Sequence, residues 1–251
     1  MGERLHNQLA VVVLAAGKGT RMKSELPKVL HPLQGMPMLG RLLRGLGVLK
    51  PARVVVVTGY GAEQVEAYAR SVLPGVEFSR QTEQRGTGHA VMMAEQALAD
   101  FNGQIMIVYG DIMLAARADA LQALRALGAE NVDGLSMLTA EVDNPTGFGR
   151  LLQRGGVLVN VEEKDCTPEQ RAVTTVNPCM YVLPAALLWQ LLAQVQPNNV
   201  QKELYLTDII ELAAKAGRRV EAAKVVAQRP EVGVNTPEEL VAMEGVLRQV
   251  A

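Results

Sequence analysis

Short apolar runs alternate with longer amphipathic stretches along the first half of the chain. Four runs rich in Val and Ile have the length of buried strands, namely Leu9–Leu14, Arg53–Thr58, Val76–Ser79 and Ile105–Tyr109. Between them, apolar residues recur at helical spacing in Met36–Leu49, Ala62–Val72 and Thr87–Ala99. Alternation of this kind indicates parallel strand–helix–strand units with right-handed crossovers. About residues 1–110 are therefore expected to form a doubly wound, Rossmann-like sheet.

The pattern changes in the second half, where strands follow one another without a helix between each pair. Strand-like runs are Leu135–Ala140, Met180–Leu183 and Val220–Val226, and the runs Arg150–Leu152 and Val157–Val161 flank Gly155-Gly156, which predicts a β-hairpin. Helical patterns cover Ala185–Val195, Leu206–Ala216 and Pro237–Val250, the last with Thr236 as its N-cap. The sequence thus predicts an α/β fold, a doubly wound mixed sheet with a β-hairpin insertion, as one domain over residues 1–251.

The composition says little about the fold but limits the kinds of binding partner that the protein can have. Lys plus Arg number 25 and Asp plus Glu 26, and a net charge of −1 does not suggest a nucleic-acid or membrane surface. The two cysteines, Cys166 and Cys179, are too few for a disulfide framework. The first apolar run, Leu9–Ala16, is too short to span a bilayer or to form a signal-peptide core. We expect a cytoplasmic protein that holds anionic small molecules with a few local cations.

The most informative segment, Leu14–Met22, directly follows the first strand. Gly17 and Gly19 allow a tight turn and a close approach to a ligand, while successive N–H groups can cradle an anion. Lys18 and Arg21 add positive charge for phosphate oxygens. The spacing matches neither a P-loop nor the G-x-G-x-x-G motif of dinucleotide-binding proteins. The segment therefore predicts another kind of polyphosphate site at the end of the first strand.

A further cation, Lys28, follows this loop within the run Leu26–Leu30. Together with the glycine loop, this run and Gly35–Met38 resemble the signature of the sugar-1-phosphate nucleotidyltransferases. Within that family the chain is most similar to the uridylyltransferase domain of the bacterial bifunctional N-acetylglucosamine-1-phosphate uridylyltransferase/glucosamine-1-phosphate acetyltransferases. The similarity covers essentially the whole chain through five more segments, Gln81–His89, Tyr109–Asp111, Asn144–Arg150, Val161–Asp165 and Gly233–Asn235.

The resemblance implies Mg²⁺-dependent transfer of a uridylyl group from UTP to N-acetylglucosamine 1-phosphate, which gives UDP-N-acetylglucosamine and pyrophosphate. Such in-line transfer depends on positioning, charge neutralisation and a metal on the phosphates. By similarity, Arg21 and Lys28 are the catalytic cations, and the Gln81 amide suits the imide edge of uracil. The nucleotide-binding positions map to Leu14, Ala15, Gly17, Lys28, Gln81, Gly86 and Thr87.

The family's metal ligands match Asp111 and Asn235. Asp111 follows a buried strand, and open α/β sheets gather ligands at the carboxyl ends of their strands. Mg²⁺ needs only one or two protein oxygens, because it keeps several waters. The sugar-binding positions map to Tyr109, Gly149, Glu162 and Asn177. The resemblance thus divides the domain into a nucleotide half (about 1–110), a sugar half (about 111–236) and a C-terminal helix (237–251).

Three departures from the family pattern cluster at the sugar end and leave the sugar open. Asn177-Pro178-Cys179 stands where the family has Asn-Thr-Gly, Lys202 replaces a usual glycine, and Asp111 is followed by Ile-Met-Leu instead of a proline-containing sequence. The hexapeptide repeats of the family's acetyltransferase β-helix are also absent from the sequence. Acetyl transfer is therefore not expected, and the oligomeric state stays open.

Two other kinds of function stay open. One is nucleotidyl transfer on the same fold with another substrate, such as a uridylyl- or thymidylyltransferase for a different hexose 1-phosphate. Guanylyltransferases for the molybdenum cofactor also belong to this group, but they lack motifs like those at Asn144–Arg150 and Glu162–Asp165 of this chain. The other is a non-catalytic nucleotide-sugar sensor, which we would expect to have lost one of the four candidate catalytic and metal-binding residues. All four are present, namely Arg21, Lys28, Asp111 and Asn235.

Overall fold

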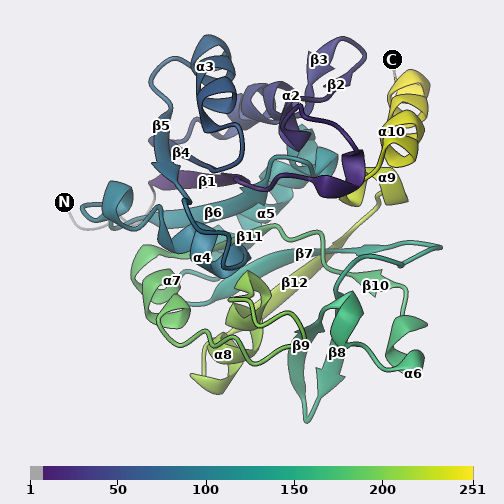
Figure 1. The fold of residues 1–251 in the computed structure, drawn as a ribbon. Coiled ribbons are helices and arrows are strands. Elements are labelled where there is room, and N and C mark those ends of the chain that lie inside the picture. Colours follow the sequence, from purple (N-terminus) through teal and green to yellow (C-terminus); the bar gives the residue numbers. More distant parts are fainter. Residues whose placement is uncertain (1–7, 251) are drawn as a thin grey trace.

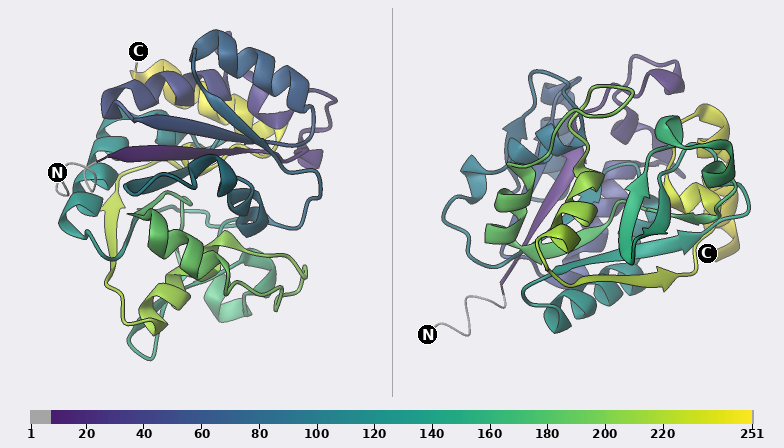
Figure 2. Two further views of the ribbon diagram at one scale, coloured as in Figure 1. Left: turned by 90° about the vertical axis from the view of Figure 1, so that its left-hand side faces the viewer. Right: turned by 90° about the horizontal axis from the view of Figure 1, so that it is seen from below.

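One mixed β-sheet forms the centre of the computed structural model, which describes residues 8–250 (Figure 1). The strand order is β5-β4-β1-β6-β11-β7-β10-β8-β9, and β12 pairs with β7 along its other edge. Helices cover both faces of the sheet (Figure 2). The predicted α/β fold with a doubly wound mixed sheet is therefore confirmed. Residues 1–7 and 251, which the predicted domain also includes, lie outside the described part.

The parallel half of the sheet follows the order β5-β4-β1-β6. Its strands are β1 (Leu9–Ala15), β4 (Arg53–Thr58), β5 (Glu77–Arg80) and β6 (Gln104–Tyr109). β1 lies between β4 and β6 and is buried along its whole length, which explains its unbroken apolar run. Because all four strands point the same way, their carboxyl ends meet at one edge of the sheet.

Successive β1 side chains point to opposite faces and enter two separate cores. Val12 and Leu14 belong to the core formed with the helices of one face, α4 (Thr87–Met92), α7 (Ala185–Leu192) and α8 (Ile209–Lys215). Val11 and Val13 belong to the core formed with the helices of the other face, α2 (Met38–Gly45), α3 (Ala62–Val72) and α5 (Ala118–Glu130). Both cores meet at the carboxyl end of β6, where Tyr109 packs against each of them.

Four predicted helices are shorter than their apolar periodicity suggests, and two of them, in the first half of the chain, differ most. A small hairpin of β2 (Pro32–Leu33) and β3 (Met36–Pro37) precedes α2, and a 3₁₀ turn (Leu46–Leu49) follows it. The segment predicted as Thr87–Ala99 is α-helical only to Met92 and later tightens into another 3₁₀ turn. A 3₁₀ turn keeps apolar residues on nearly the same face as an α-helix, so the pattern alone does not reveal the change.

The helix α5 was not predicted from the sequence. Its buried positions are Ala120, Leu121, Leu124 and Gly128, and because two of these four are small, the apolar stripe contrasts only weakly with the rest of the helix. A Cβ at Gly128 would lie 2.6 Å from Cγ1 of Val182. The small side chains therefore let this helix pack closely against the sheet.

The second half extends the sheet with β7 (Leu135–Glu141), β11 (Tyr181–Pro184) and β12 (Val220–Val225). β11 runs antiparallel between β6 and β7, and β12 runs parallel to β7. The predicted hairpin consists of β8 (Arg150–Arg154) and β9 (Val157–Val161), and Gly155 and Gly156 both have positive φ (60° and 80°), as a type I′ turn requires. The remaining elements are β10 (Thr175–Val176), α6 (Pro168–Arg171), α9 (Arg229–Val232) and α10 (Pro237–Val250).

A wide bulge makes the sheet fork beside the end of β6. On the segment that runs antiparallel along β7, Val176 pairs with Ala140 and Tyr181 pairs with Met137. Residues 177–180 therefore face only residues 138 and 139, so the bulge accommodates two extra residues. On one side of the bulge β11 pairs with β6, and on the other side β10 pairs with β8. The hairpin is thus separated from the parallel half of the sheet.

The C-terminal helix α10 begins as predicted. The hydroxyl of Thr236 accepts a hydrogen bond from the Glu239 N–H at 3.2 Å, which makes Thr236 the N-cap. In the part of the chain that the structure describes, no helix combines the length and apolarity needed to cross a bilayer.

Candidate active site

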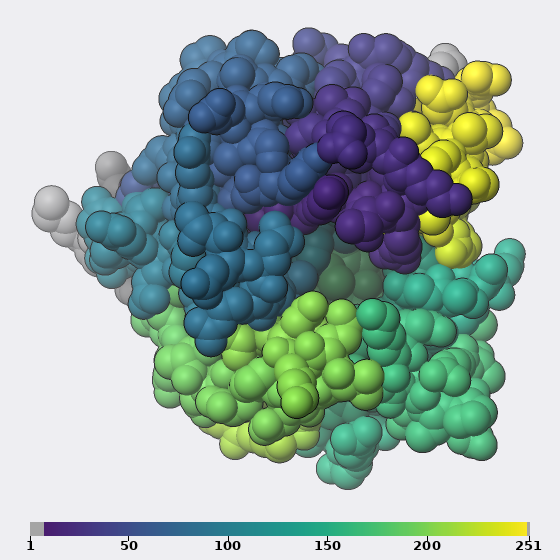
Figure 3. Space-filling model, in the orientation of Figure 1, coloured from purple at the N-terminus to yellow at the C-terminus, as the bar shows by residue number. Residues whose placement is uncertain are grey.

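A cavity of about 360 Å³ lies where the sheet forks, at the carboxyl ends of β1 and β6. It corresponds to the hollow between the N-terminal half and the second half of the chain in the space-filling view (Figure 3). All fourteen predicted site residues line it: Leu14, Ala15, Gly17, Arg21, Lys28, Gln81, Gly86, Thr87, Tyr109, Asp111, Gly149, Glu162, Asn177 and Asn235. The structure thus brings these residues together, while their individual roles stay predictions.

The glycine loop folds back against Lys28. Gly19 has a left-handed backbone (φ 66°), and a Cβ there would lie 2.6 Å from Cβ of Lys28. Only glycine therefore allows the loop and Lys28 to pack this closely. Gly17 lines the cavity, and a Cβ there would meet no atom within 4 Å, so this backbone faces open space. A ligand can approach the peptide groups of this loop directly.

The cations of the loop are directed differently. Arg21, in the 3₁₀ turn Thr20–Met22, is exposed, lines the cavity and has no ion pair with any described residue. Lys18 instead lies over the ring of Tyr60, with its ammonium 5.0 Å from the ring centroid, and it does not line the cavity. The positive charge that faces the cavity from this loop is therefore that of Arg21, and the expectation that Lys18 contributes to it is not supported.

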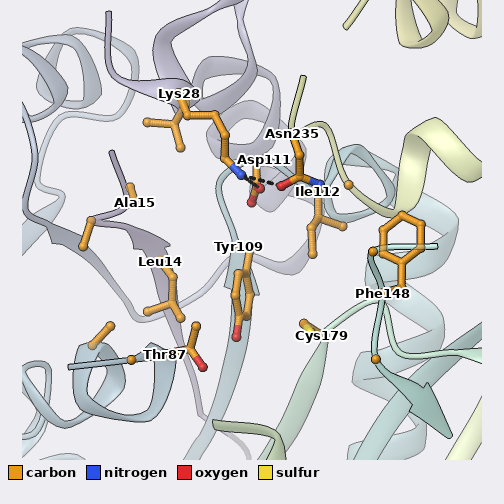
Figure 4. A pocket seen from close by; sticks show the side chains of 18 of the residues that line it. Leu14, Ala15, Lys28, Thr87, Tyr109, Asp111, Ile112, Phe148, Cys179 and Asn235 are labelled. Carbon is orange, nitrogen blue, oxygen red and sulfur yellow. Dashed lines mark hydrogen bonds and ion pairs between the residues drawn. The ribbon is translucent and has the colours of Figure 1, made fainter. Parts of the chain in front are cut away.

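Lys28, Asp111 and Asn235 meet at the centre of the site (Figure 4). The Lys28 ammonium forms an ion pair with the Asp111 carboxylate and donates a hydrogen bond to Oδ1 of Asn235 at 2.9 Å. The side chains of Lys28 and Asp111 are only 16% and 14% exposed. Two oxygen atoms from distant parts of the sequence thus converge on one cationic group.

Backbone contacts fix these two oxygen donors. The Gly110 N–H donates to the carbonyl of Leu14 at 2.9 Å, which holds the residues after β6 beside the glycine loop. The Val234 N–H donates to the carbonyl of Asp111 at 3.1 Å, so the segment that carries Asn235 is bound directly to the one that carries Asp111.

The donor set fits a hard divalent cation. Among residues 8–250, no group of three or more His, Cys, Asp or Glu side chains could hold a metal ion. The oxygen donors that would hold a metal at this place are the carboxylate of Asp111 and the amide oxygen of Asn235, and water and substrate phosphates would supply the other ligands. Mg²⁺ favours such a site, because it is usually held by one or two protein oxygens together with substrate phosphates.

Gln81, the predicted base-binding residue, is buried directly after β5. Its amide nitrogen donates to the carbonyl of Gly86 at 3.0 Å and contacts Nδ1 of His89 at 3.1 Å. The Gln81 side chain therefore organises the following loop through its amide nitrogen, and its carbonyl oxygen accepts no hydrogen bond from the described residues. Gly86 is required there, because its φ is 108° and a Cβ would lie 2.5 Å from the carbonyl oxygen of Leu204.

Glu162, a predicted sugar-binding residue, lies just after β9. Its Oε1 accepts hydrogen bonds from Nδ2 of Asn160 at 2.8 Å and from the hydroxyl of Thr207 at 2.9 Å. Burial raises the pKa of Glu162, although these two hydrogen bonds act in the opposite direction. The second carboxylate oxygen accepts no hydrogen bond from the described residues, and Glu162 lines the cavity.

Asn177 shapes the bulge with its own side chain. Its Oδ1 accepts from the Cys179 N–H at 2.8 Å, and its Nδ2 donates to Oδ1 of Asn160 at 3.1 Å and to the hydroxyl of Tyr181 at 2.6 Å. Both amide hydrogens are thus already used within the protein. Gly149 accepts from the Asn177 N–H at 3.1 Å, and a Cβ at Gly149 would lie 2.4 Å from Oδ1 of Asn160. Gly149 therefore permits the close packing on which this network depends.

The two positions where a glycine was expected keep a glycine-like backbone. Cys179 has φ of 52° and Lys202 has φ of 53°, a left-handed conformation that side chains rarely adopt. Cys179 replaces the first of these glycines and lines the cavity, where its thiol lies 3.7 Å from the carbonyl oxygen of Asn177 (Figure 4). The substitution therefore takes up room in the wall of the cavity beside Asn177.

Some lining residues were not assigned from the sequence. Phe148 and Ile112 line the cavity beside Asp111 and Asn235, and Gln84 donates to the carbonyl of Ala16 at 2.7 Å. Phe148 lies within the motif Asn144–Arg150, which was a usable signal. Ile112 belongs to the run Ile-Met-Leu after Asp111, which departs from the family pattern, but the sequence did not show that its side chain lines the cavity.

A model of the MobA-like NTP transferase domain family matches residues 11–154 of the chain. The chain is also 48% identical over 239 residues to the bifunctional protein GlmU of a Thermus thermophilus strain, and 43% identical over 244 residues to that of Chromobacterium violaceum. These matches cover 95% and 96% of this chain and 51% and 52% of the relatives, so the chain spans about half their length.

Among solved structures, the crystal structure of UDP-glucose pyrophosphorylase complexed with UDP-glucose matches with a TM-score of 0.76, over 97% of this chain and 100% of the other. At 18% sequence identity this likeness concerns the fold alone. The family match covers more than half of the chain and includes the glycine loop, Lys28 and Asp111. The chain therefore belongs to the family of MobA-like NTP transferase domains, and the resemblance of its motifs to the sugar-1-phosphate nucleotidyltransferases is confirmed.

Proposed function

We propose that this chain transfers a uridylyl group from UTP to N-acetylglucosamine 1-phosphate with the help of Mg²⁺, and releases pyrophosphate. The observation that carries this proposal is the meeting of Lys28 with Asp111 and Asn235 between a glycine loop on one side and the Glu162–Asn177 wall on the other. One cavity thus offers cations and amides for a polyphosphate, oxygen ligands for a metal, and hydrogen-bonding groups for a sugar. A cytoplasmic location stays a prediction.

The reaction needs positioning and charge neutralisation from the protein rather than a covalent intermediate. An oxygen of the sugar phosphate attacks the α-phosphorus of UTP, and the bond from that phosphorus to the bridging oxygen of the leaving pyrophosphate breaks. Arg21 and the Lys28 ammonium stabilise the negative charge on the phosphates, and the backbone near Gly17 holds the nucleotide. Nucleotidyltransferases of this type generally use a divalent metal, which supplies further charge neutralisation when it is held by Asp111 and Asn235.

Recognition of the base is assigned to Gln81. Because its amide nitrogen is bonded to Gly86 and His89, the group it offers to a ligand is the carbonyl oxygen. A carbonyl oxygen accepts from the imide N–H of uracil or thymine and cannot pair with the corresponding acceptor nitrogen of cytosine. This acceptor favours UTP and also leaves dTTP as an alternative substrate.

The sugar is assigned to the wall formed by Tyr109, Gly149, Glu162 and Asn177. Glu162 offers a free carboxylate oxygen for sugar hydroxyl groups, and Asn177 contributes mainly by shaping the bulge. The motifs of this half resemble those of enzymes that use N-acetylglucosamine 1-phosphate. Cys179 in the wall is the observation that favours a second candidate, another hexose 1-phosphate with a smaller substituent.

Pyrophosphate release tests the proposal. UTP, dTTP, CTP and GTP are each combined with N-acetylglucosamine 1-phosphate, glucose 1-phosphate and galactose 1-phosphate, with Mg²⁺ and with chelator. We expect the largest kcat/KM for UTP with N-acetylglucosamine 1-phosphate and no release with chelator. A preference for another sugar retains the mechanism and replaces the substrate. No release with any pair, combined with tight UTP binding, indicates the non-catalytic sensor.

A further inference from the structure

Arg229, at the start of α9, lies outside the cavity, contacts the loop that precedes β8 and is linked through Glu239 to the segment of Asn235. It does not line the cavity, so it touches no substrate there. Its Nε donates to the carbonyl of Asn144 at 3.0 Å, and its Nη2 donates to the carbonyl of Thr146 at 3.2 Å. The guanidinium carbon also lies 5.3 Å from the centre of the Phe148 ring. One side chain thus holds the loop that precedes β8 at three points.

That loop supplies part of the cavity wall. Gly147, Phe148 and Gly149 all line the cavity. The Phe148 ring is buried, and a Cβ at Gly233 would lie 3.2 Å from its Cε1, so the ring packs against the segment that leads to Asn235. The position of this wall therefore depends on the contacts that Arg229 makes with its backbone and its ring.

The same guanidinium group reaches the segment of Asn235 through Glu239. Nη1 of Arg229 forms an ion pair with Oε1 of Glu239 at 3.0 Å, and Oε2 of Glu239 accepts from the Asn235 N–H at 2.7 Å. Glu239 is itself fixed in the first turn of α10, where its N–H donates to Thr236. A continuous chain of contacts thus links Asn144, Thr146 and Phe148 to the backbone of Asn235.

We propose that Arg229 is a positioning residue that sets the distance between the Phe148–Gly149 wall and Asn235. This proposal rests on the proposed function. It means that Arg229 and Glu239 align the sugar 1-phosphate with the oxygen atoms of Asp111 and Asn235. Arginine suits this task, because its planar group can donate to two carbonyls and a carboxylate while its face lies on an aromatic ring. Lysine at the same place could keep the ion pair with Glu239 but not the other contacts.

The part of the cavity that is proposed to bind the base does not depend on the contacts of Arg229. Gln81 and Gly86 belong to segments that Arg229 does not contact. Loss of the Arg229 contacts should therefore affect the sugar 1-phosphate much more than UTP. Misplacement of a substrate-positioning group by about 1 Å can cost about 100-fold in rate. For Arg229→Ala we expect a rise of at least ~10-fold in KM for the sugar 1-phosphate, with KM for UTP changed by less than about twofold.

Arg53 provides a matched control. Its side chain is 26% exposed, against 27% for Arg229, and it forms ion pairs with Glu77 at 2.5 Å and Asp100 at 2.7 Å away from the cavity. Arg53→Ala should leave both KM values near wild type. Arg229→Lys should recover only part of the loss, and the Arg229→Ala/Glu239→Gln double variant should be no worse than Arg229→Ala, because both changes break one linkage.

The experiment measures KM for each substrate in wild type and these variants, together with calorimetric binding of UDP-N-acetylglucosamine, which does not depend on turnover. A selective rise in the sugar KM and weaker product binding in Arg229→Ala, absent in Arg53→Ala, supports the proposal. Unchanged product affinity, equal losses for Arg229→Ala and Arg53→Ala, or additive effects of Arg229 and Glu239 overturns it. A wild type that binds the product but releases no pyrophosphate contradicts the proposed function alone, because the binding comparison still judges Arg229.

Discussion

The ammonium group of Lys28 lies 2.9 Å from Oδ1 of Asn235, a residue 207 positions away in the sequence, and it is also ion-paired with Asp111. The two oxygens expected to hold a metal are thus bound to a side chain that is itself expected to bind phosphate. A metal and the Lys28 ammonium cannot both occupy the space between these oxygens. Binding of the triphosphate, which attracts Lys28, should therefore favour binding of the metal.

Removal of Lys28 tests this competition. Without nucleotide, Lys28→Ala should bind Mn²⁺ at least ~10-fold more tightly than wild type, because the carboxylate of Asp111 loses its cationic partner. Turnover should fall by ~10²-fold, because a cation at the phosphates is lost. Electron paramagnetic resonance titration of free Mn²⁺ measures the affinity. Lys18→Ala, which removes a lysine of the same loop that lies on Tyr60, is the control, and equal Mn²⁺ affinity in all three proteins would contradict the competition.

Asp111→Asn should raise the concentration of Mg²⁺ needed for half-maximal pyrophosphate release. The substitution keeps the shape of the side chain but removes the negative charge that attracts the cation. It also removes the ion pair with Lys28. A titration of Mg²⁺ at saturating UTP is the measurement, and a curve that coincides with that of wild type would remove Asp111 from the metal site.

Arg21→Ala should lower kcat by more than ~10²-fold and leave the fold intact, because it removes charge stabilisation of the transition state. The fold should tolerate the change, since Arg21 is exposed and has no ion pair with the described residues. Circular dichroism and thermal unfolding check the fold, and single-turnover kinetics check the chemical step. Wild-type turnover in this variant would exclude Arg21 from the mechanism.

Asp208→Asn should stabilise the protein at neutral pH. Burial, followed by the nearby charges of Glu162, Glu211 and Asp165, raises the pKa of Asp208 from 3.8 to about 6. A carboxyl whose pKa is raised by folding binds its proton more tightly in the native state, so its ionisation costs stability. That cost is absent below the unfolded pKa near 4, grows between about pH 4 and pH 6, and is complete above pH 6.

The melting temperature of Asp208→Asn should therefore exceed that of wild type at pH 8, and the two should converge at pH 4 and below. Differential scanning calorimetry at both pH values gives the comparison. Asp133→Asn, at an exposed aspartate before β7, controls for the loss of one negative charge from the whole protein. A difference between Asp208→Asn and wild type that is the same at pH 4 and pH 8 would exclude this titration.

The apolar runs predicted most of the sheet, because a strand buried on both faces leaves a sequence signal that does not depend on its neighbours. The strands around Val12, Val55 and Ile107 were located to within a residue or so. α5 was missed because small residues occupy two of its four buried positions, which weakens the apolar stripe, and the ends of α2 and α4 were misplaced because a 3₁₀ turn preserves the apolar periodicity.

Some features of the candidate site were likewise predictable from the sequence, and others were not. The glycine loop and Lys28 are close in sequence and follow one strand, so local pattern was enough to expect a phosphate site there. The sequence did not predict that Arg21 faces the cavity while Lys18 lies on Tyr60, because both are exposed cations in one loop. The role of Arg229 was likewise invisible, because its partners lie in other segments.

The sequence by itself determined the parallel strand–helix units, the hairpin at Gly155-Gly156 and the residue types available for phosphate, metal and sugar. Only the tertiary structure decided that Lys28, Asp111 and Asn235 meet at one point, and that the sheet forks at residues 177–180. The physical reason is the sequence separation over which the interactions act. Strand and turn preferences arise from neighbouring residues, whereas the meeting of three charged and polar side chains depends on how the two halves of the sheet pack and on which buried polar groups find partners.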